Sequence, residues 1–174
     1  NPLGTYYAWP FAFNGVGEIQ FREFDGVAWV ERAGSASGRG LSVTPGASLA
    51  PSLAYDPLGR PVIAWSDDTS GNEEIHVKRL EAGAWVGLGG SSAGGGVSAT
   101  PPPSRPPSMS INSDGQPVVA WEAQVSESNT EVHVRAFDGA RWVEFGAGAA
   151  TGPGVSDTAL GSGGPRHAGS GGRF

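Results

Sequence analysis

Short runs of apolar and polar residues alternate along most of the chain. In residues 74–78, Ile75 and Val77 fall on one face of an extended segment, and charged or polar residues fall on the other. This is the period of two that a β-strand requires. Residues 61–65 are instead apolar at every position, which favours a strand buried on both faces. No stretch has helical periodicity of useful length, so the pattern predicts a chain of short strands.

The strand pattern returns at intervals of about 56 residues. Its clearest landmark is the series Trp9, Trp65 and Trp121, whose members are 56 residues apart. A complete unit contains four predicted strands joined by turns such as the Ser-Asp-Gly sequence at 113–115. Four-stranded units repeated at this interval are typical of β-propeller blades. Further landmarks with this spacing are Trp29, Trp85 and Trp142; Glu18, Glu74 and Glu131; and Gly-Leu/Val-Ser at 40–42, 96–98 and 154–156.

The sequence therefore predicts an all-β fold of β-propeller-type four-stranded antiparallel blades. About three repeats would form a partial or oligomer-completed propeller, with blades at about 1–44, 45–100 and 101–158. We interpret residues 159–174 as a Gly/Ser-rich tail or as a degenerate strand that closes the first blade. Because the chain begins within a repeat, without the first strand of its first unit, we expect a processed or incomplete polypeptide.

Three blades leave two uncovered faces. Propeller rings close with four to eight blades, and a large apolar face is rarely exposed on a soluble monomer. Two chains could form a six-bladed ring with twofold symmetry. Alternatively, the three blades could belong to a longer chain, or an unrelated protein could cover the open faces. The expected partner is therefore a protein or a second copy of the chain.

Composition excludes several classes of function. The net charge of −6 argues against a nucleic-acid partner, because binding a phosphate backbone needs a cationic surface. The absence of cysteine excludes a disulfide framework, a thiolate metal site and a cysteine nucleophile. No apolar run has the length needed to cross a bilayer. The chain therefore has no predicted transmembrane segment, and no cofactor is predicted.

The first unit departs from the repeat in a run of aromatic residues. Residues 9–14 read Trp-Pro-Phe-Ala-Phe-Asn, whereas the equivalent segments 66–68 and 122–124 are polar. We interpret this run as a loop whose two phenylalanines anchor a partner, because buried aromatic residues dominate interface energetics. The alternative is that they cover the exposed end of the first blade. The predicted partner-binding residues are Tyr6, Tyr7, Pro10, Phe11 and Phe13.

The two tryptophan series have different expected roles. Trp9, Trp65 and Trp121 end the most buried strand, so we expect them in the core. The second series follows a hairpin turn on the outer strand, where flat indole rings could stack on a sugar or contact a partner. The candidates for ligand stacking are Trp29, Trp85 and Trp142.

Two groups of residues could hold a metal ion. His76 and His133 share one repeat position, but no third ligand accompanies them, so we interpret them as strand residues replicated with the repeat. One loop is rich in oxygen ligands that calcium prefers. Its spacing differs from that of an EF-hand, and the other units do not repeat it, so a solvated turn is preferred. The four residues of this weak calcium candidate are Asp67, Asp68, Asn72 and Glu73.

The sequence contains no catalytic constellation that we can assemble. Its serines lie in glycine-rich segments without a paired histidine, and no G-x-S-x-G motif is present. Glu73 and Glu74 fall on opposite faces of a strand start, which is a poor arrangement for acid–base catalysis. The proline-rich residues 101–107 are interpreted as a rigid spacer, with a proline-recognition motif as the alternative.

Two segments carry a family resemblance. Residues 52–59 followed by Trp65, and residues 108–115 followed by Trp121, resemble bacterial exported β-propeller repeats that are distantly similar to sialidase-type, Asp-box blades. The aromatic residue of an Asp box follows the glycine closely, whereas Trp65 lies six residues beyond Gly59. The resemblance implies a propeller and export to the periplasm or the exterior. It does not carry over glycosidase activity, because a sialidase's arginine triad and Tyr/Glu pair are not found.

These observations favour a non-catalytic binding or scaffolding module of the bacterial envelope or exterior. Such a module could act as an accessory subunit of a larger assembly. The alternative is a lectin-like propeller that binds a glycan between or on its blades. A fragment of a sialidase-like enzyme is the least favoured interpretation, because activity would need residues from other blades.

Overall fold

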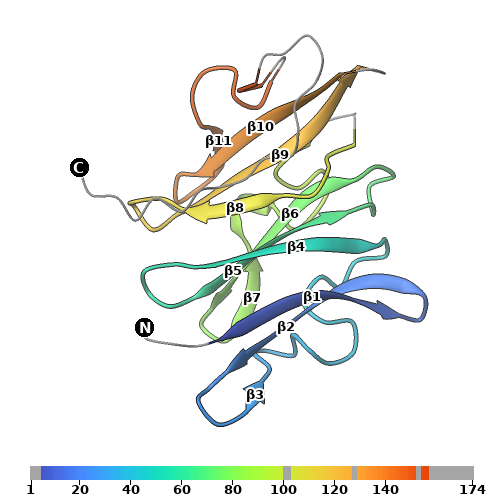
Figure 1. Cartoon of the computed structure of the whole chain (residues 1–174), viewed down its shortest axis with the longest axis vertical. Helices are drawn as coiled ribbons and strands as arrows, with labels where there is room; N and C mark the ends of the chain where they lie inside the picture. The colour runs from blue at the N-terminus through green and yellow to red at the C-terminus, as the bar shows by residue number, and fades with distance from the viewer. Residues whose placement is uncertain (1–4, 100–102, 127–128, 152–153, 157–174) are drawn as a thin grey trace.

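The computed structural model describes residues 5–99, 103–126, 129–151 and 154–156, and it confirms the predicted all-β, propeller-type fold. Three antiparallel sheets follow one another along the molecule, from the blue sheet to the orange one in Figure 1. Apart from one 3-10 turn, η1 (Leu88–Gly90), the described residues form no helix. None of them therefore forms a helix long and apolar enough to cross a membrane. The predicted tail or closing strand at 159–174 lies outside the described residues.

We call the three sheets blades 1, 2 and 3. The strands of each sheet are hydrogen-bonded to one another in chain order. Blade 1 contains β1 (Tyr6–Phe13), β2 (Val16–Phe24) and β3 (Trp29–Val30). Blade 2 contains β4 (Ser48–Tyr55), β5 (Pro61–Asp67), β6 (Glu74–Glu81) and β7 (Ala84–Gly87). Blade 3 contains β8 (Ser108–Ile111), β9 (Pro117–Ser126), β10 (Asn129–Phe137) and β11 (Trp142–Glu144).

The apolar strand β5 is buried on both faces, as its sequence predicts. Ile63 and Trp65 pack toward blade 1, and the alternate residues Val62 and Ala64 pack toward blade 3. All four are fully buried. Trp121, the equivalent of Trp65 in β9, is also fully buried, so both tryptophans belong to the core that joins neighbouring blades.

The aromatic run of blade 1 is a strand, which corrects the predicted loop. β1 pairs with β2 without interruption from Tyr6 opposite Glu23 to Phe13 opposite Val16. The chain reverses at Asn14 and Gly15, whose φ angles are 51° and 84°. A two-residue hairpin turn with both residues at positive φ is the arrangement that Asn-Gly favours. Because only two residues form the turn, Phe11 and Phe13 belong to the strand and not to a loop.

The repeated Gly-Leu/Val-Ser segment docks on the third strand of each unit. In blade 2 the amide of Val97 donates to the Ile75 carbonyl (2.6 Å). Ser98 Oγ accepts from the Ile75 amide (2.8 Å) and donates to the buried carboxylate of Glu74. Blades 1 and 3 repeat these contacts with Leu41, Ser42 and Glu18, and with Val155, Ser156 and Glu131. The repeated spacing of glutamate and serine within this chain therefore reflects one structural contact made three times.

Candidate functional site

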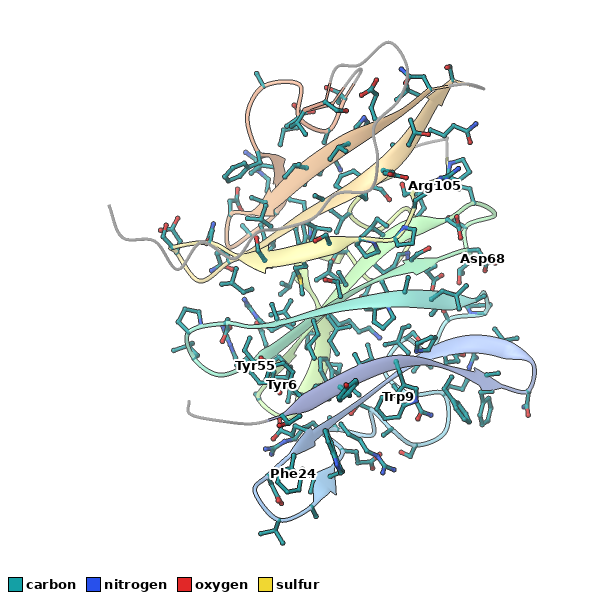
Figure 2. All side chains as sticks on the ribbon, in the orientation of Figure 1. Tyr6, Trp9, Phe24, Tyr55, Asp68 and Arg105 are labelled. Atoms are coloured by element: carbon teal, nitrogen blue, oxygen red, sulfur yellow. The ribbon has the colours of Figure 1, made fainter. Side chains whose placement is uncertain are left out.

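The outer face of β1 is uncovered. Tyr7 and Phe11 are 63% and 44% exposed, and Trp9, which Figure 2 labels, is half-buried between them on the same side of the strand. The equivalents of Tyr7 and Trp9 in blade 2 are Ile63 and Trp65, which are fully buried against blade 1. Among the described residues, no sheet precedes blade 1, so its corresponding face has no covering layer.

Trp29 of β3 completes this surface. Its ring lies edge-on to Tyr7 with the ring centroids 6.0 Å apart, and it is 45% exposed. The sequence placed Trp29 and Tyr7 in two separate candidate groups. The common 56-residue register and the antiparallel pairing of β2 and β3 are the signals that could have placed Tyr7 and Trp29 on one surface. We call the surface formed by Tyr7, Trp9, Phe11 and Trp29 the first-blade face.

The other two tryptophans of the stacking series connect neighbouring blades. Trp85 Nε1 donates to the Arg32 carbonyl of blade 1, and Trp142 Nε1 donates to the Leu88 carbonyl of blade 2, each at 2.8 Å. Trp85 also packs edge-on against Phe21, with 5.5 Å between the ring centroids. These contacts engage both indoles in packing. Trp29 is therefore the member of the series that remains available to a partner.

The remaining predicted contact residues lie at the margins of the first-blade face. Tyr6 points away from it and packs against Tyr55 of blade 2, with 4.3 Å between the ring centroids. Pro10 is exposed, and Phe13 is half-buried beside the hairpin turn. The structure therefore brings Tyr7 and Phe11 together and places Tyr6 in a different environment.

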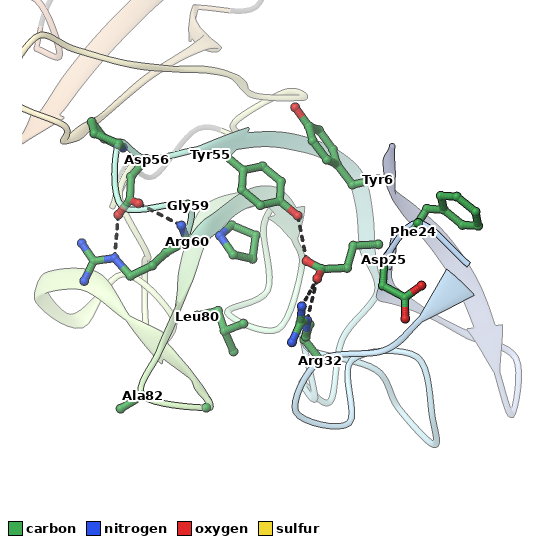
Figure 3. Close-up of a pocket in the computed structure, with 15 residues that line it drawn as sticks. Tyr6, Phe24, Asp25, Arg32, Tyr55, Asp56, Gly59, Arg60, Leu80 and Ala82 are labelled. Carbon is green, nitrogen blue, oxygen red and sulfur yellow. Dashed lines mark hydrogen bonds and ion pairs between the residues drawn. The ribbon is translucent and has the colours of Figure 1, made fainter. Parts of the chain in front are cut away.

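That environment is an open cleft of about 860 Å³ between blades 1 and 2. Figure 3 shows Tyr6, Tyr55, Arg32 and Arg60 among its lining residues. Tyr55 Oη donates to one carboxylate oxygen of Glu23 (3.1 Å), and Arg32 Nε donates to the other (2.7 Å). The cleft thus combines aromatic rings with polar groups, which is the chemistry of a site for a small polar ligand.

The Tyr55 hydroxyl and both arginines of the cleft are already paired. Burial and the neighbouring Glu23 carboxylate raise the pKa of Tyr55, so its hydroxyl stays a hydrogen-bond donor. The hydrogen bond that Arg32 donates to the Glu23 carboxylate raises the pKa of the Arg32 guanidinium. Arg60 Nε donates to Asp56 at 2.7 Å. A carboxylate with both oxygens engaged is poorly placed to take a proton from a substrate, so this arrangement suits binding better than acid–base catalysis.

Three of the four residues of the weak calcium candidate have separate side-chain partners. Asp67 is buried and accepts from the hydroxyls of Thr44 (2.6 Å) and Ser48 (2.7 Å), whereas Asp68 accepts from the Ala47 amide. Burial alone would raise the pKa of Asp67, but the hydrogen bonds outweigh this effect and lower it. Asn72 donates to Glu74, and Glu73 is half-buried beside it. Within the described ranges, no three acidic or histidine side chains are grouped as a metal site.

The two repeated histidines each pack against the tryptophan of their own blade. His76 is buried beside Trp65, and His133 is buried beside Trp121, with ring centroids 5.8 Å apart in both pairs. Burial lowers the pKa of His76, because the interior penalises the imidazolium more than the neutral ring. This arrangement gives both histidines a packing role, whereas the sequence indicated only strand residues on a polar face that are replicated with the repeat.

His76 should make the fold sensitive to mild acid. Its folded pKa lies below its unfolded value of about 6.5. Its contribution is therefore fully present above pH 6.5 and is lost as the pH falls, at up to about 1.4 kcal/mol per pH unit. His76→Gln introduces the residue found at the equivalent position of blade 1, Gln20. Urea unfolding at pH 7.5 and 5.5 should show a smaller loss of stability for this variant than for the wild type. An identical pH dependence would contradict this assignment.

No protein-family model and no curated protein matches the chain. The solved structure of an endo-arabinase from Bacteroides thetaiotaomicron VPI-5482 is similar, with 16% identity and a TM-score of 0.51. The match covers 80% of this chain, and this chain spans only 55% of the endo-arabinase chain. A fucose lectin from Kordia zhangzhouensis in complex with methyl-fucoside gives 14% identity and a TM-score of 0.47, over 82% of this chain and 90% of the lectin. At these identities the likeness concerns the fold alone.

Proposed function

We propose that this chain is a non-catalytic protein-binding or scaffolding module whose contact surface is the first-blade face. The supporting observation is the contrast between Tyr7 and Trp9, which are exposed or half-buried, and their fully buried equivalents in blade 2. We expect a partner to cover a blade face of this composition, because exposed aromatic clusters mark interaction sites on soluble proteins. Export to the bacterial envelope or exterior, as an accessory subunit, is part of this proposal.

The chemistry of the first-blade face favours a protein over other ligands. Four aromatic side chains from two strands form a broad apolar surface, rather than a cavity sized for a small molecule. A net charge of −6 disfavours a nucleic acid. Aromatic anchors of this kind contribute most when a partner removes them fully from water. We therefore assign the face to association rather than to catalysis.

A photo-crosslinking amino acid at position 11 tests this proposal. The chain would be produced in its native cells with the crosslinker replacing Phe11 or, as a control, Leu58, which is 76% exposed on a turn of blade 2. We expect a covalent adduct with one defined protein from position 11 and not from position 58, identified by mass spectrometry. No adduct from position 11, or the same adducts from both positions, would count against the proposal.

The cleft between blades 1 and 2 supports a second candidate function, carbohydrate binding. Tyr6 is 40% exposed at its rim, and hydroxyl, guanidinium and carboxylate groups surround it. Flat rings beside such groups suit the apolar faces and hydroxyls of a sugar. Tyr6→Ala should abolish any signal on a glycan array, while Tyr7→Ala, on the other side of the same strand, should retain it. No response of the wild-type chain across a broad array would eliminate this alternative.

A further inference from the structure

The two internal blade interfaces use the same indole hydrogen bond. Trp85 of blade 2 donates its Nε1–H to the Arg32 carbonyl of blade 1, and Trp142 of blade 3 donates to the Leu88 carbonyl of blade 2. In both cases the acceptor follows the outermost strand of the preceding blade. The equivalent donor in blade 1 is Trp29, and the equivalent acceptor in blade 3 is the Phe145 carbonyl.

A cationic side chain forms a second repeated contact across each interface. Lys78 Nζ donates to the Leu41 carbonyl of blade 1 at 2.6 Å, and Arg135 Nη1 donates to the Val97 carbonyl of blade 2 at 2.5 Å. Both acceptors are the middle residue of the Gly-Leu/Val-Ser segment. By position in the repeat, Arg22 of blade 1 is the next donor and the Val155 carbonyl of blade 3 is the next acceptor.

Apolar packing completes each interface in the same way. Ile63 and Trp65 of blade 2 pack on the blade 1 residues Ile19, Phe21 and Leu41. The blade 2–blade 3 interface repeats this with the equivalent residues Val119 and Trp121 against Ile75, Val77 and Val97. Each blade therefore has one face that accepts the following blade and another that docks on the preceding one.

In the part of the chain that the structure describes, no blade packs on the accepting face of blade 3. Phe145 and Val155 are 57% and 54% exposed. Val132 and Val134 are only half-buried, although their blade 2 equivalents, Ile75 and Val77, are fully buried. Neither the Phe145 carbonyl nor the Val155 carbonyl has a hydrogen-bond donor among the described residues. We call the surface formed by Val132, Val134, Phe145 and Val155 the last-blade face.

The first-blade face has the matching unused donors. Arg22 is exposed and has no hydrogen-bond or ion-pair partner in the described part of the chain. The indole nitrogen of Trp29 also has no hydrogen-bond partner among the described residues. The chain therefore carries, on its two end blades, both halves of an interface that it already forms twice internally.

We infer that the occupant of the first-blade face is the last-blade face of a second copy of this chain. This inference rests on the proposed function and names its partner. Trp29 would donate to the Phe145 carbonyl of the other copy, and Arg22 to its Val155 carbonyl, while Tyr7 and Trp9 cover its valines. Two such contacts close a ring with twofold symmetry. Two copies bring six blades, which lies within the four to eight of known propellers, whereas three copies would bring nine.

Sedimentation velocity of the 174-residue chain and its variants tests the inference. The wild type should sediment as a dimer, with twice the 17.7 kDa mass of one chain. Tyr7→Asp on the first-blade face and Phe145→Asp on the last-blade face should each yield folded monomers, because every interface uses both faces. Leu58→Asp, on an exposed turn away from both faces, should remain dimeric. Circular dichroism and thermal unfolding would establish that each variant is folded.

Mixing the two monomeric variants gives the sharpest outcome. Tyr7→Asp retains its last-blade face and Phe145→Asp retains its first-blade face, so the mixture should form a heterodimer through one intact interface. A monomeric wild type would overturn the inference, as would a Phe145→Asp variant that stays dimeric. In either case, the crosslinker at Phe11 still decides the proposed function separately. An adduct with a different protein would support the proposed binding function but contradict a second copy as the partner. The absence of any adduct would contradict both proposals.

Discussion

Gly96→Ala should destabilise the chain by about 3 kcal/mol or more, or prevent it from folding. Gly96 has a φ of 61°, which already disfavours a side chain, and a Cβ atom there would overlap the Ile75 carbonyl oxygen. Relief requires the segment to move away from β6. That movement would break the hydrogen bond from Val97 to the same carbonyl. Urea unfolding followed by tryptophan fluorescence would measure the loss.

Gly94 supplies the matched control, because it separates backbone strain from steric overlap. Its φ of 57° is similar to that of Gly96, but no atom lies within 4 Å of an added Cβ. Gly94→Ala should therefore cost about 1 kcal/mol, the strain of a left-handed residue alone. Equal losses for the two variants would contradict the docking of the Gly-Val-Ser segment on β6. Both should be measured at one protein concentration, since self-association would add to apparent stability.

Ser98→Ala should cost about 3 kcal/mol, although it removes a single oxygen atom. Ser98 Oγ bridges two buried groups, accepting from the Ile75 amide and donating to the Glu74 carboxylate. Its loss leaves a buried N–H without its acceptor and a buried carboxylate with one donor fewer, each of which costs about 1–3 kcal/mol. The amide of Asn72 still donates to the other carboxylate oxygen, so the site retains part of its support.

Ser113→Ala is the control for Ser98→Ala. Ser113 is exposed at the turn before β9 and has no hydrogen-bond partner among the described residues. Its replacement should change the free energy of unfolding by less than about 0.5 kcal/mol. Chemical unfolding curves of the two variants and the wild type give the comparison. A Ser98→Ala variant as stable as Ser113→Ala would show that the repeated Glu–Ser contact is not structurally important.

The sequence predicted the sheets and their buried strand because both follow from local periodicity. A period of two places side chains on alternate faces, and the 56-residue interval aligns three copies of each position. The apolar character of every position in residues 61–65 was therefore enough to identify a doubly buried strand. The packing of Trp65 against one blade and Val62 against another follows from that alternation.

Contacts between elements distant in sequence do not follow from local periodicity. The glutamate and serine landmarks were recognised as repeats, but their mutual hydrogen bond depends on a segment that returns 24 residues later. Blade 1 also replaces the supporting amide of Asn72 with Arg39, which reaches Glu18 from a different segment. The loop prediction for Phe11 is wrong for a local reason, because the Asn14-Gly15 pair makes a two-residue turn that keeps Phe11 in the strand. The cleft beside Tyr55 arises only when two blades are placed together.

Hydroxyl-radical footprinting of the native particle tests most directly whether the first-blade face is a contact surface. We predict that Tyr7, Phe11 and Trp29 are oxidised slowly in the native particle. Leu58 should be oxidised rapidly in the same sample, because it is exposed on a turn outside that face. Oxidation of Tyr7, Phe11 and Trp29 at the rate expected from their exposure in the isolated chain would contradict the assignment of this face to association.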